Sequence, residues 1–297
     1  MYHGVRFDMN FKQLWQEGMK DWNGELPERM TDDSKEEAFW ETFIPKKANA
    51  LDDYAAAIRT ELLRLIEPGD SVLEVGPGWG NYTFAAAEKA SALTCVDSSR
   101  SVLDYLQEET RRQGLPHTRF IHAKWEEYMP PAESFDVVFG INCYYRMQQI
   151  DRALLNMNHA AKRLAIIGLT SGPEKPHLYE IHRQLGCKIK FQRRDYIYLT
   201  NMLYELGIDA NCKIIDIQRT YRYDSEEQLI KANLAAIQDA DYDRKAAEAI
   251  LHQYVIEHDG GYLYTHQFKA ALLYWRPQKL YASGALKVEG ALEAKEA

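Results

Sequence analysis

Short apolar runs alternate with longer amphipathic stretches through the middle of the chain. The runs predict strands at 71–75, 92–96, 119–123, 135–141 and 164–169. The stretches between them predict helices at 81–90, 99–113 and 148–162. Strands that alternate with helices of this length indicate βαβ units and a parallel sheet covered on both faces. The pattern therefore predicts an α/β fold with right-handed crossovers.

The flanking regions are less regular. Apolar residues at helical spacing predict a helix over 46–66, which Pro68 and Gly69 end. After residue 171 the pattern predicts helices at 195–206, 225–237 and 243–257, and strands at 213–223 and 262–275.

The first 45 residues differ from the rest. They contain Trp15, Trp22 and Trp40 and the charged run 31–37. We expect helical pieces packed over the main domain, either as ordinary core packing or as a lid over a ligand cleft.

The expected organisation is then a helical cap at 1–45 and a main domain at 46–276. Additions within 171–262, which include a helical insertion before the last strand, would shape the substrate pocket. The segment 277–297 is rich in Ala, Gly, Lys and Glu and is predicted to be a mobile tail.

Composition narrows the class of protein. The 297 residues are 46% hydrophobic and 27% charged, which is typical of a globular chain with a full-sized core. The net charge of −8 argues against extended binding to nucleic acid or to an anionic membrane surface. The four cysteines are scattered and lack zinc-site spacing, so we expect a reducing compartment and no metal. No secretory signal or membrane-spanning run is apparent, so the prediction is a soluble, cytoplasmic protein.

A glycine-rich turn follows the first predicted strand. Gly76, Gly78 and Gly80 let the backbone approach a ligand closely at the edge where α/β sheets bind ligands. The spacing is G-x-G-x-G, whereas a dinucleotide fingerprint has its third glycine at the position that Asn81 occupies. No Gly-Lys-Ser/Thr follows, so the turn is not a nucleoside triphosphate P-loop.

Two carboxylates flank this turn. Glu74 lies two residues before Gly76, where it would repel a pyrophosphate but suit an ammonium or sulfonium group. Asp97 ends the second predicted strand, where an acidic residue accepts hydrogen bonds from ribose hydroxyls.

Three blocks together, 74–80, 95–99 and 135–139, resemble the class I, Rossmann-like S-adenosylmethionine-dependent methyltransferases. The resemblance implies a mostly parallel seven-stranded sheet with an antiparallel last strand that includes 268–275. It also implies S-adenosylmethionine (SAM) as cofactor. The implied cofactor-binding residues are Gly76, Gly78 and Gly80 under the methionine part, Glu74 near its ammonium group, Asp97 on the ribose, Trp125 beside the adenine and Asn142 near the methionine end.

One position departs from that pattern. Many members have an aspartate after the third strand that bonds the adenine amino group, but the matching residue here is Lys124. A lysine cannot accept that bond, so either Glu126 or the backbone would serve.

The acceptor side is predicted at 142–146, after the fourth strand. Tyr144 and Tyr145 are the candidate catalytic residues, which would orient the acceptor or stabilise charge. The segment around His177 has no metal-site spacing and predicts a polar surface helix. Arg193 and Arg194 fit a solvated helix start or, alternatively, contact with an acidic substrate.

The predicted function is transfer of a methyl group from SAM to a small molecule, without nucleic-acid or membrane partners. Homo-oligomer formation, the acceptor and the use of a general base stay open. One alternative is an NAD-dependent Rossmann oxidoreductase, which Asn81 and the charge of Glu74 disfavour. The other is a non-catalytic module that binds SAM or a partner protein.

Overall fold

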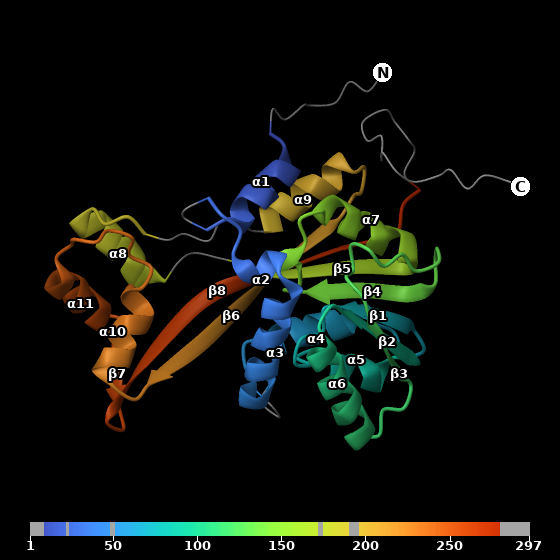
Figure 1. Ribbon diagram of the computed structural model, residues 1–297, viewed down its shortest axis with the longest axis horizontal. Coiled ribbons are helices and arrows are strands. Elements are labelled where there is room, and N and C mark those ends of the chain that lie inside the picture. The colour runs from blue at the N-terminus through green and yellow to red at the C-terminus, as the bar shows by residue number, and fades with distance from the viewer. Residues whose placement is uncertain (1–8, 22–23, 48–50, 172–174, 190–195, 280–297) are drawn as a thin grey trace, which may run out of the picture.

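A computed structural model of the chain describes residues 9–21, 24–47, 51–171, 175–189 and 196–279 (Figure 1). Its centre is a sheet in the order β3-β2-β1-β4-β5-β8-β6, with β7 paired to β8 off this path. The strands are β1 (Ser71–Val75), β2 (Ala92–Asp97), β3 (Thr118–His122), β4 (Phe135–Ile141), β5 (Ala161–Ser171), β6 (Asn211–Tyr223), β7 (Val255–His258) and β8 (Gly261–Trp275). The five strands β1 to β5 pair in parallel, as the alternating pattern predicts.

Side chains from β1 enter two different cores because successive strand residues point to opposite faces. Leu73 and Val75 join one core, whereas Val72 joins the other. The first core lies under α1 (Phe11–Met19), α7 (Ile150–Ala160) and α9 (Tyr196–Glu205); the second lies under α4 (Ala55–Leu65) and α5 (Thr83–Lys89), with α6 (Arg100–Arg112) beside them (Figure 1).

Strand β8 pairs antiparallel with both β5 and β6. The expected antiparallel last strand is therefore confirmed, and Phe268–Trp275 forms its C-terminal half. The expected seven-strand path is present, and the short strand β7 adds an eighth strand to the sheet.

Helices α2 (Glu28–Thr31) and α3 (Asp33–Lys47) lie beside the C-terminal ends of the parallel strands. The predicted helix over 46–66 is wrong at its start. Helix α3 continues past Pro45, and α4 begins only at Ala55. Between them, Asn81 Oδ1 accepts a hydrogen bond from the Asp52 amide at 3.0 Å, which fixes this segment as a turn against the glycine loop.

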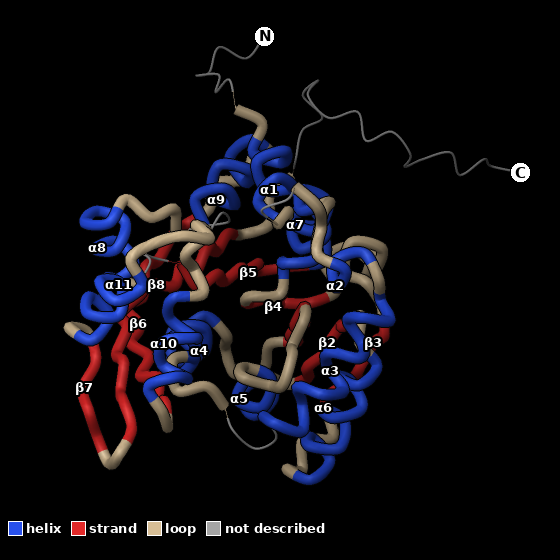
Figure 2. The backbone as a smooth tube through the Cα atoms, turned by 60° about the vertical axis from the view of Figure 1, so that its left-hand side comes forward, coloured by secondary structure: helices blue, strands red, loops and turns tan. Residues whose placement is uncertain are grey.

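Beyond the main body, β6 and β8 extend together into a second group of elements (Figures 1 and 2). This group, here called the lobe, comprises β7, the outer ends of β6 and β8, and helices α8 (Pro176–Leu185), α10 (Glu226–Leu234) and α11 (Arg244–His252). It has its own apolar core, which includes Leu229 and Leu251. The insertion predicted before the last strand is therefore helical, as expected.

Two expectations for the lobe are wrong. The helix predicted over 243–257 ends at His252, because Val255–His258 pairs with β8. His177 lies on α8 but is fully buried instead of on a polar surface. Its two ring nitrogens are within 2.8 Å of the Tyr264 hydroxyl and 3.1 Å of the Asn233 carbonyl oxygen, so the ring is satisfied inside the core.

Several expectations fall on residues outside the described ranges, among them Trp22, Arg193, Arg194 and most of the predicted tail. The start of that tail is described, and Gln278 donates its amide to Asn158 Oδ1 at 3.0 Å. Within the described ranges, no helix is long and apolar enough to cross a membrane. The same ranges contain no group of three or more side chains that could hold a metal ion. The boundary predicted at residue 45 stays a prediction.

Candidate functional site

A cavity of about 610 Å³ lies at the C-terminal ends of β1, β2 and β4. Helices α2 and α3 form its opposite wall, so the segment before residue 45 covers a pocket. Its lining includes six of the predicted site residues: Gly76, Gly78, Asp97, Trp125, Asn142 and Tyr145. Three others, Glu74, Gly80 and Tyr144, are not part of the lining.

The glycine loop passes between the segment that follows β4 and the α3 helix. Gly76 has a φ of +61°, and a Cβ atom there would lie 2.3 Å from Cys143 Cβ. Gly78 has a φ of +56° and faces Trp40 of α3, whose nearest ring atom would lie 3.5 Å from an added Cβ. The positive φ favours glycine at both positions, and at Gly76 any side chain would also clash with Cys143. The loop thus exposes its backbone to the cavity.

Glu74 lies behind this loop, with only 2% of its surface exposed. Burial raises the pKa of its carboxyl group to about 8. Its neighbour on β2 is Cys95, whose Sγ lies 3.8 Å from Glu74 Oε2.

Asp97 ends β2 and faces the cavity. Its Oδ1 accepts a hydrogen bond from the Ser99 amide at 2.8 Å, in the turn that begins α6. Burial raises the pKa of the Asp97 carboxyl group to about 7, and the nearby carboxylate of Glu36 acts in the same direction. The site thus holds an acidic group short of positive partners, which suits a ligand that donates hydrogen bonds.

Trp125 and Asn142 line the cavity with their polar atoms already engaged. The Trp125 indole donates to the Ala153 carbonyl oxygen at 3.0 Å, which fixes the ring. Asn142 adopts a φ of +56°, and its Oδ1 accepts a hydrogen bond from the Thr170 amide at 2.8 Å. This bond joins the ends of β4 and β5, so Asn142 shapes the cavity floor.

The two candidate tyrosines lie in different environments. Tyr144 is 1% exposed, and its hydroxyl donates to the Gly140 carbonyl oxygen at 2.8 Å inside the core. The Tyr145 hydroxyl instead donates to Glu36 at the cavity. Burial, together with this bond to Glu36, raises the pKa of Tyr145, so its hydroxyl stays protonated.

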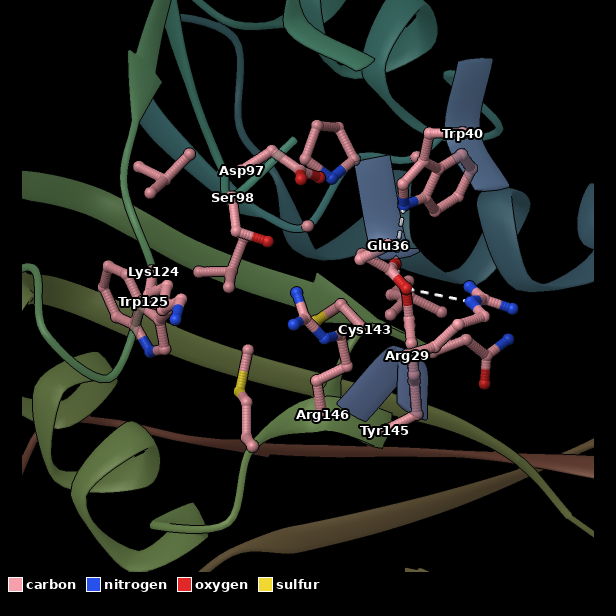
Figure 3. Close-up of a pocket in the computed structure, with 18 of the residues that line it drawn as sticks. Arg29, Glu36, Trp40, Asp97, Ser98, Lys124, Trp125, Cys143, Tyr145 and Arg146 are labelled. Atoms are coloured by element: carbon pink, nitrogen blue, oxygen red, sulfur yellow. Dashed lines mark hydrogen bonds and ion pairs between the residues drawn. The ribbon is translucent and has the colours of Figure 1, made fainter. Parts of the chain in front are cut away.

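Glu36 is the residue that sequence reasoning missed. It is 2% exposed and lies at the centre of the α3 wall (Figure 3). Its Oε1 accepts hydrogen bonds from the Trp40 indole at 2.7 Å and from the Tyr145 hydroxyl, and its Oε2 accepts from Arg29 Nε at 2.9 Å. A single carboxylate therefore joins α2, α3 and the segment after β4.

A signal for Glu36 was present in the sequence. Glu36, Trp40 and Phe43 are three or four residues apart, which places them on one helical face. The charged run 31–37 obscured this face, because a run of acids and lysines is usually solvated.

Two further acids of α3 contact the ends of other strands. Asp33 binds Lys124 Nζ and an Arg146 nitrogen, each at 2.7 Å. The bond from Lys124, followed by that from Arg146, lowers the pKa of Asp33. Glu37 Oε1 accepts a hydrogen bond from the Ser101 amide at 2.8 Å, at the start of α6.

Lys124, which stands where many members of the family have an aspartate, has a partner in the structure. Lys124 follows β3 and pairs with the cap at Asp33. Glu126 lines the cavity, and its Oε1 accepts a hydrogen bond from the Gln149 amide at 2.7 Å.

Residues 72–163 match the protein family described as "Methyltransferase domain". A Haemophilus influenzae protein described as uncharacterized is 26% identical over 92% of this chain and 99% of its own length. "Ribosomal RNA small subunit methyltransferase A" from Prosthecochloris aestuarii is 26% identical over 42% of this chain. That match spans only about half (51%) of the relative. A chain in the solved complex of a methyltransferase with the Haloferax volcanii Trm112 methyltransferase activator aligns over 83% of this chain and 99% of its own length. Its TM-score is 0.52 and its identity 13%, so it supports the fold.

The family match, the strand order and the glycine loop agree. Residues 72–163 therefore belong to a methyltransferase domain, and the sheet as a whole has the Rossmann-like methyltransferase fold. The roles of the individual site residues stay predictions.

Proposed function

We propose that this methyltransferase acts on a small-molecule acceptor inside the cavity between the glycine loop and α3. The observation that carries the proposal is the cavity itself. Its volume of about 610 Å³ falls in the range of small-ligand pockets, and a helix of the same chain forms its outer wall. Three acids of that helix bind the segments after β2, β3 and β4.

The residues present fit SAM. The glycine loop presents backbone where a side chain would fill the space, and Asp97 offers a carboxylate to ribose hydroxyls. We assign Gly76 and Gly78 to the methionine part, Asp97 to the ribose and the Trp125 ring to the adenine. We assign Glu74 and Gly80 to support behind the loop, because neither lines the cavity.

When bound, SAM supplies a methyl group activated by its sulfonium. The protein then has to align an acceptor atom with that methyl group and exclude water. Tyr145 is the tyrosine that we assign to acceptor orientation, because its hydroxyl lies at the cavity and is held by Glu36. Tyr144 is assigned to the core beneath it.

The proposal includes a cytoplasmic setting. Cys95, Cys143, Cys187 and Cys212 are all free thiols, which suits a reducing compartment.

An RNA acceptor is the second candidate, favoured by the partial match to a ribosomal RNA methyltransferase. A base held within a folded RNA would have to leave its stack to reach a cavity covered by α3. The net charge of −8 also disfavours extended RNA contact.

Two measurements test the proposal. Calorimetric titration with SAM, S-adenosylhomocysteine (SAH) and NAD should show binding of the first two alone. Methyl-labelled SAM is then incubated with the enzyme and a metabolite extract, or with total RNA as the parallel arm. We expect label in the low-molecular-weight fraction. Label that accumulates in RNA alone would overturn the small-molecule assignment and leave the methyltransferase class intact.

A further inference from the structure

The strip of sheet between the main body and the lobe carries an unusual set of side chains. On β6, Ile217 packs into the core under α4 and α5, and Tyr223 packs into the core of the lobe. Both side chains lie on one face of the sheet. Arg219 and Tyr221 lie between them in the strand, on the same face and half-buried. Helix α4 of the main body and helix α10 of the lobe therefore lie at opposite ends of this strip. Arg219 belongs to none of the apolar cores found among the described residues.

Arg219 is held by aromatic rings. Its guanidinium carbon lies 5.2 Å from the centre of the Tyr54 ring and 4.8 Å from that of Tyr221. Within the described residues it makes no ion pair and no hydrogen bond. Stacking fixes a guanidinium plane and leaves its N–H edges able to bind a carboxylate or phosphate. Among the residues that the structure describes, this half-buried charge therefore has no anionic partner of the kind that usually accompanies it.

A second cation adjoins the first. Lys175 Nζ lies 4.5 Å from the centre of the Tyr221 ring and donates a hydrogen bond to Asn233 Oδ1 at 2.7 Å. Both cations thus contact the Tyr221 ring, and an anion that reached both would be attracted by two positive charges. His266 lies opposite Arg219 in the β6–β8 register and stacks on Phe268.

The strip adjoins the cavity at Tyr54. Tyr54, which carries Arg219 on its ring, also lines that cavity. Burial raises the pKa of Tyr54 to about 12, so its hydroxyl stays neutral at physiological pH and adds no competing negative charge.

We propose that Arg219 and Lys175 form an anion subsite for the acceptor, which binds its carboxylate or phosphate group while the reactive end enters the cavity past Tyr54. The proposal rests on the small-molecule function and narrows it to acidic acceptors. It also gives the lobe a role, because α10 fixes Lys175 through Asn233 and thereby sets one side of the subsite.

The test uses the full chain saturated with SAH and labelled with ¹⁵N at arginine. Inorganic phosphate and succinate are titrated separately while the arginine side-chain N–H signals are recorded. We expect one signal, identified by its loss in Arg219→Gln, to shift saturably with one or both anions, and the stronger response distinguishes phosphate from carboxylate. Anion affinity, measured by calorimetry on the same SAH-saturated protein, should fall about 10- to 100-fold in Arg219→Gln.

Arg222→Gln is the matched control. Arg222 lies on the same strand but on the opposite face and is exposed, so its loss should leave the titration unchanged. Equal weakening by both variants, or an Arg219 signal that does not respond to either anion, would overturn the subsite.

Two other results would also overturn it. If Arg219→Gln weakens SAH binding as much as anion binding, the guanidinium serves the carboxylate of the cofactor. If a short single-stranded oligoribonucleotide binds through both Arg219 and Arg222, the strip is an RNA surface. Because the titration needs no turnover, its outcome is independent of where the methyl label goes. Failure of the subsite and failure of the small-molecule function are therefore distinguishable.

Discussion

Buried titratable groups differ between the capped half of the molecule and the lobe, both in the direction of their pKa shifts and in how fully they are hydrogen-bonded. In the capped half, formed by α2, α3 and the ends of β1, β2 and β4, Glu74 and Asp97 are carboxylates whose pKa values burial raises. In the lobe, burial lowers the pKa of His177 to about 4, and both of its ring nitrogens have partners. His177 in the lobe core is therefore fully hydrogen-bonded, whereas the capped half keeps Asp97 at the cavity, where a ligand can satisfy it.

This difference separates a structural polar network from a binding site. A buried imidazole that stays neutral and hydrogen-bonded stabilises one packing arrangement. Buried carboxylates with few donors lower stability until a partner arrives. We therefore expect mutations and pH to act differently on the two regions.

The largest effect is expected at Gly76. Gly76→Ala combines a positive φ with a Cβ atom 2.3 Å from Cys143 Cβ, so it should destabilise the protein by about 2–5 kcal/mol. Gly114→Ala is the control, since Gly114 has a φ of +72° but open space around it. The control should cost about 1–2 kcal/mol in urea unfolding. Equal losses in the two variants would contradict the close approach of the loop to Cys143, after β4.

The pH dependence of local stability should have opposite signs in the two regions. An unfolded histidine titrates near 6.5, so between pH 6.5 and about 4 the unfolded chain binds a proton that His177 does not. The contribution of His177 to the stability of the lobe is fully present above pH 6.5. It falls by roughly 3 kcal/mol as the pH drops from 6.5 to about 4.

The ligand-free capped half should respond in reverse. Glu74 keeps its proton up to about pH 8, whereas an unfolded glutamate loses it near 4.5, so stability falls as the pH rises between these values. Hydrogen exchange of each region, corrected for the intrinsic pH dependence of exchange, measures both slopes. The same sign in both regions would contradict the comparison.

Asp97 should affect the cofactor more than the fold. Asp97→Asn keeps an oxygen for the Ser99 amide but loses the charge, so SAH affinity should fall about 10- to 100-fold in calorimetry. Asp104→Asn, on the exposed side of α6, serves as the control and should bind SAH normally. Unchanged affinity in a folded Asp97→Asn protein would remove Asp97 from the cofactor site.

The smallest effect is expected at the outer edge of the cap. The Asp33 side chain is 57% exposed, so Asp33→Asn should change the free energy of unfolding by no more than about 1 kcal/mol. Loss of the Asp33 charge releases Lys124 and Arg146 from α3. Because the cap is then held less firmly, SAH should dissociate faster in stopped-flow measurements. A much larger loss of stability would mean that Asp33 holds the fold and not merely the cap.

The sequence predicted the elements whose local pattern and tertiary environment agree. The strands β1, β2 and β4 are short apolar runs because both of their faces are buried, and the glycine loop follows from its spacing. Strand β7 was missed because its pairing with β8, and not its own pattern, determines its conformation.

The lining of the cavity was predicted on the side of the sheet and missed on the side of the cap. Gly76 and Asp97 lie in motifs next to their strands, so their position follows from local sequence. Glu36 reaches Tyr145 across 109 positions, and such a contact depends on how α3 packs. His177 was misplaced for the same reason, since its partners come from α10 and β8.

We infer that the cofactor lies between the glycine loop and α3, and that the lobe is not part of its site. Hydrogen exchange with and without saturating SAH tests this claim most directly. We predict slower exchange in the glycine loop, in α3 and in the turn after β2, with α10 and α11 unchanged. Protection confined to the lobe, or a loop that SAH protects while α3 stays unaffected, would contradict the account.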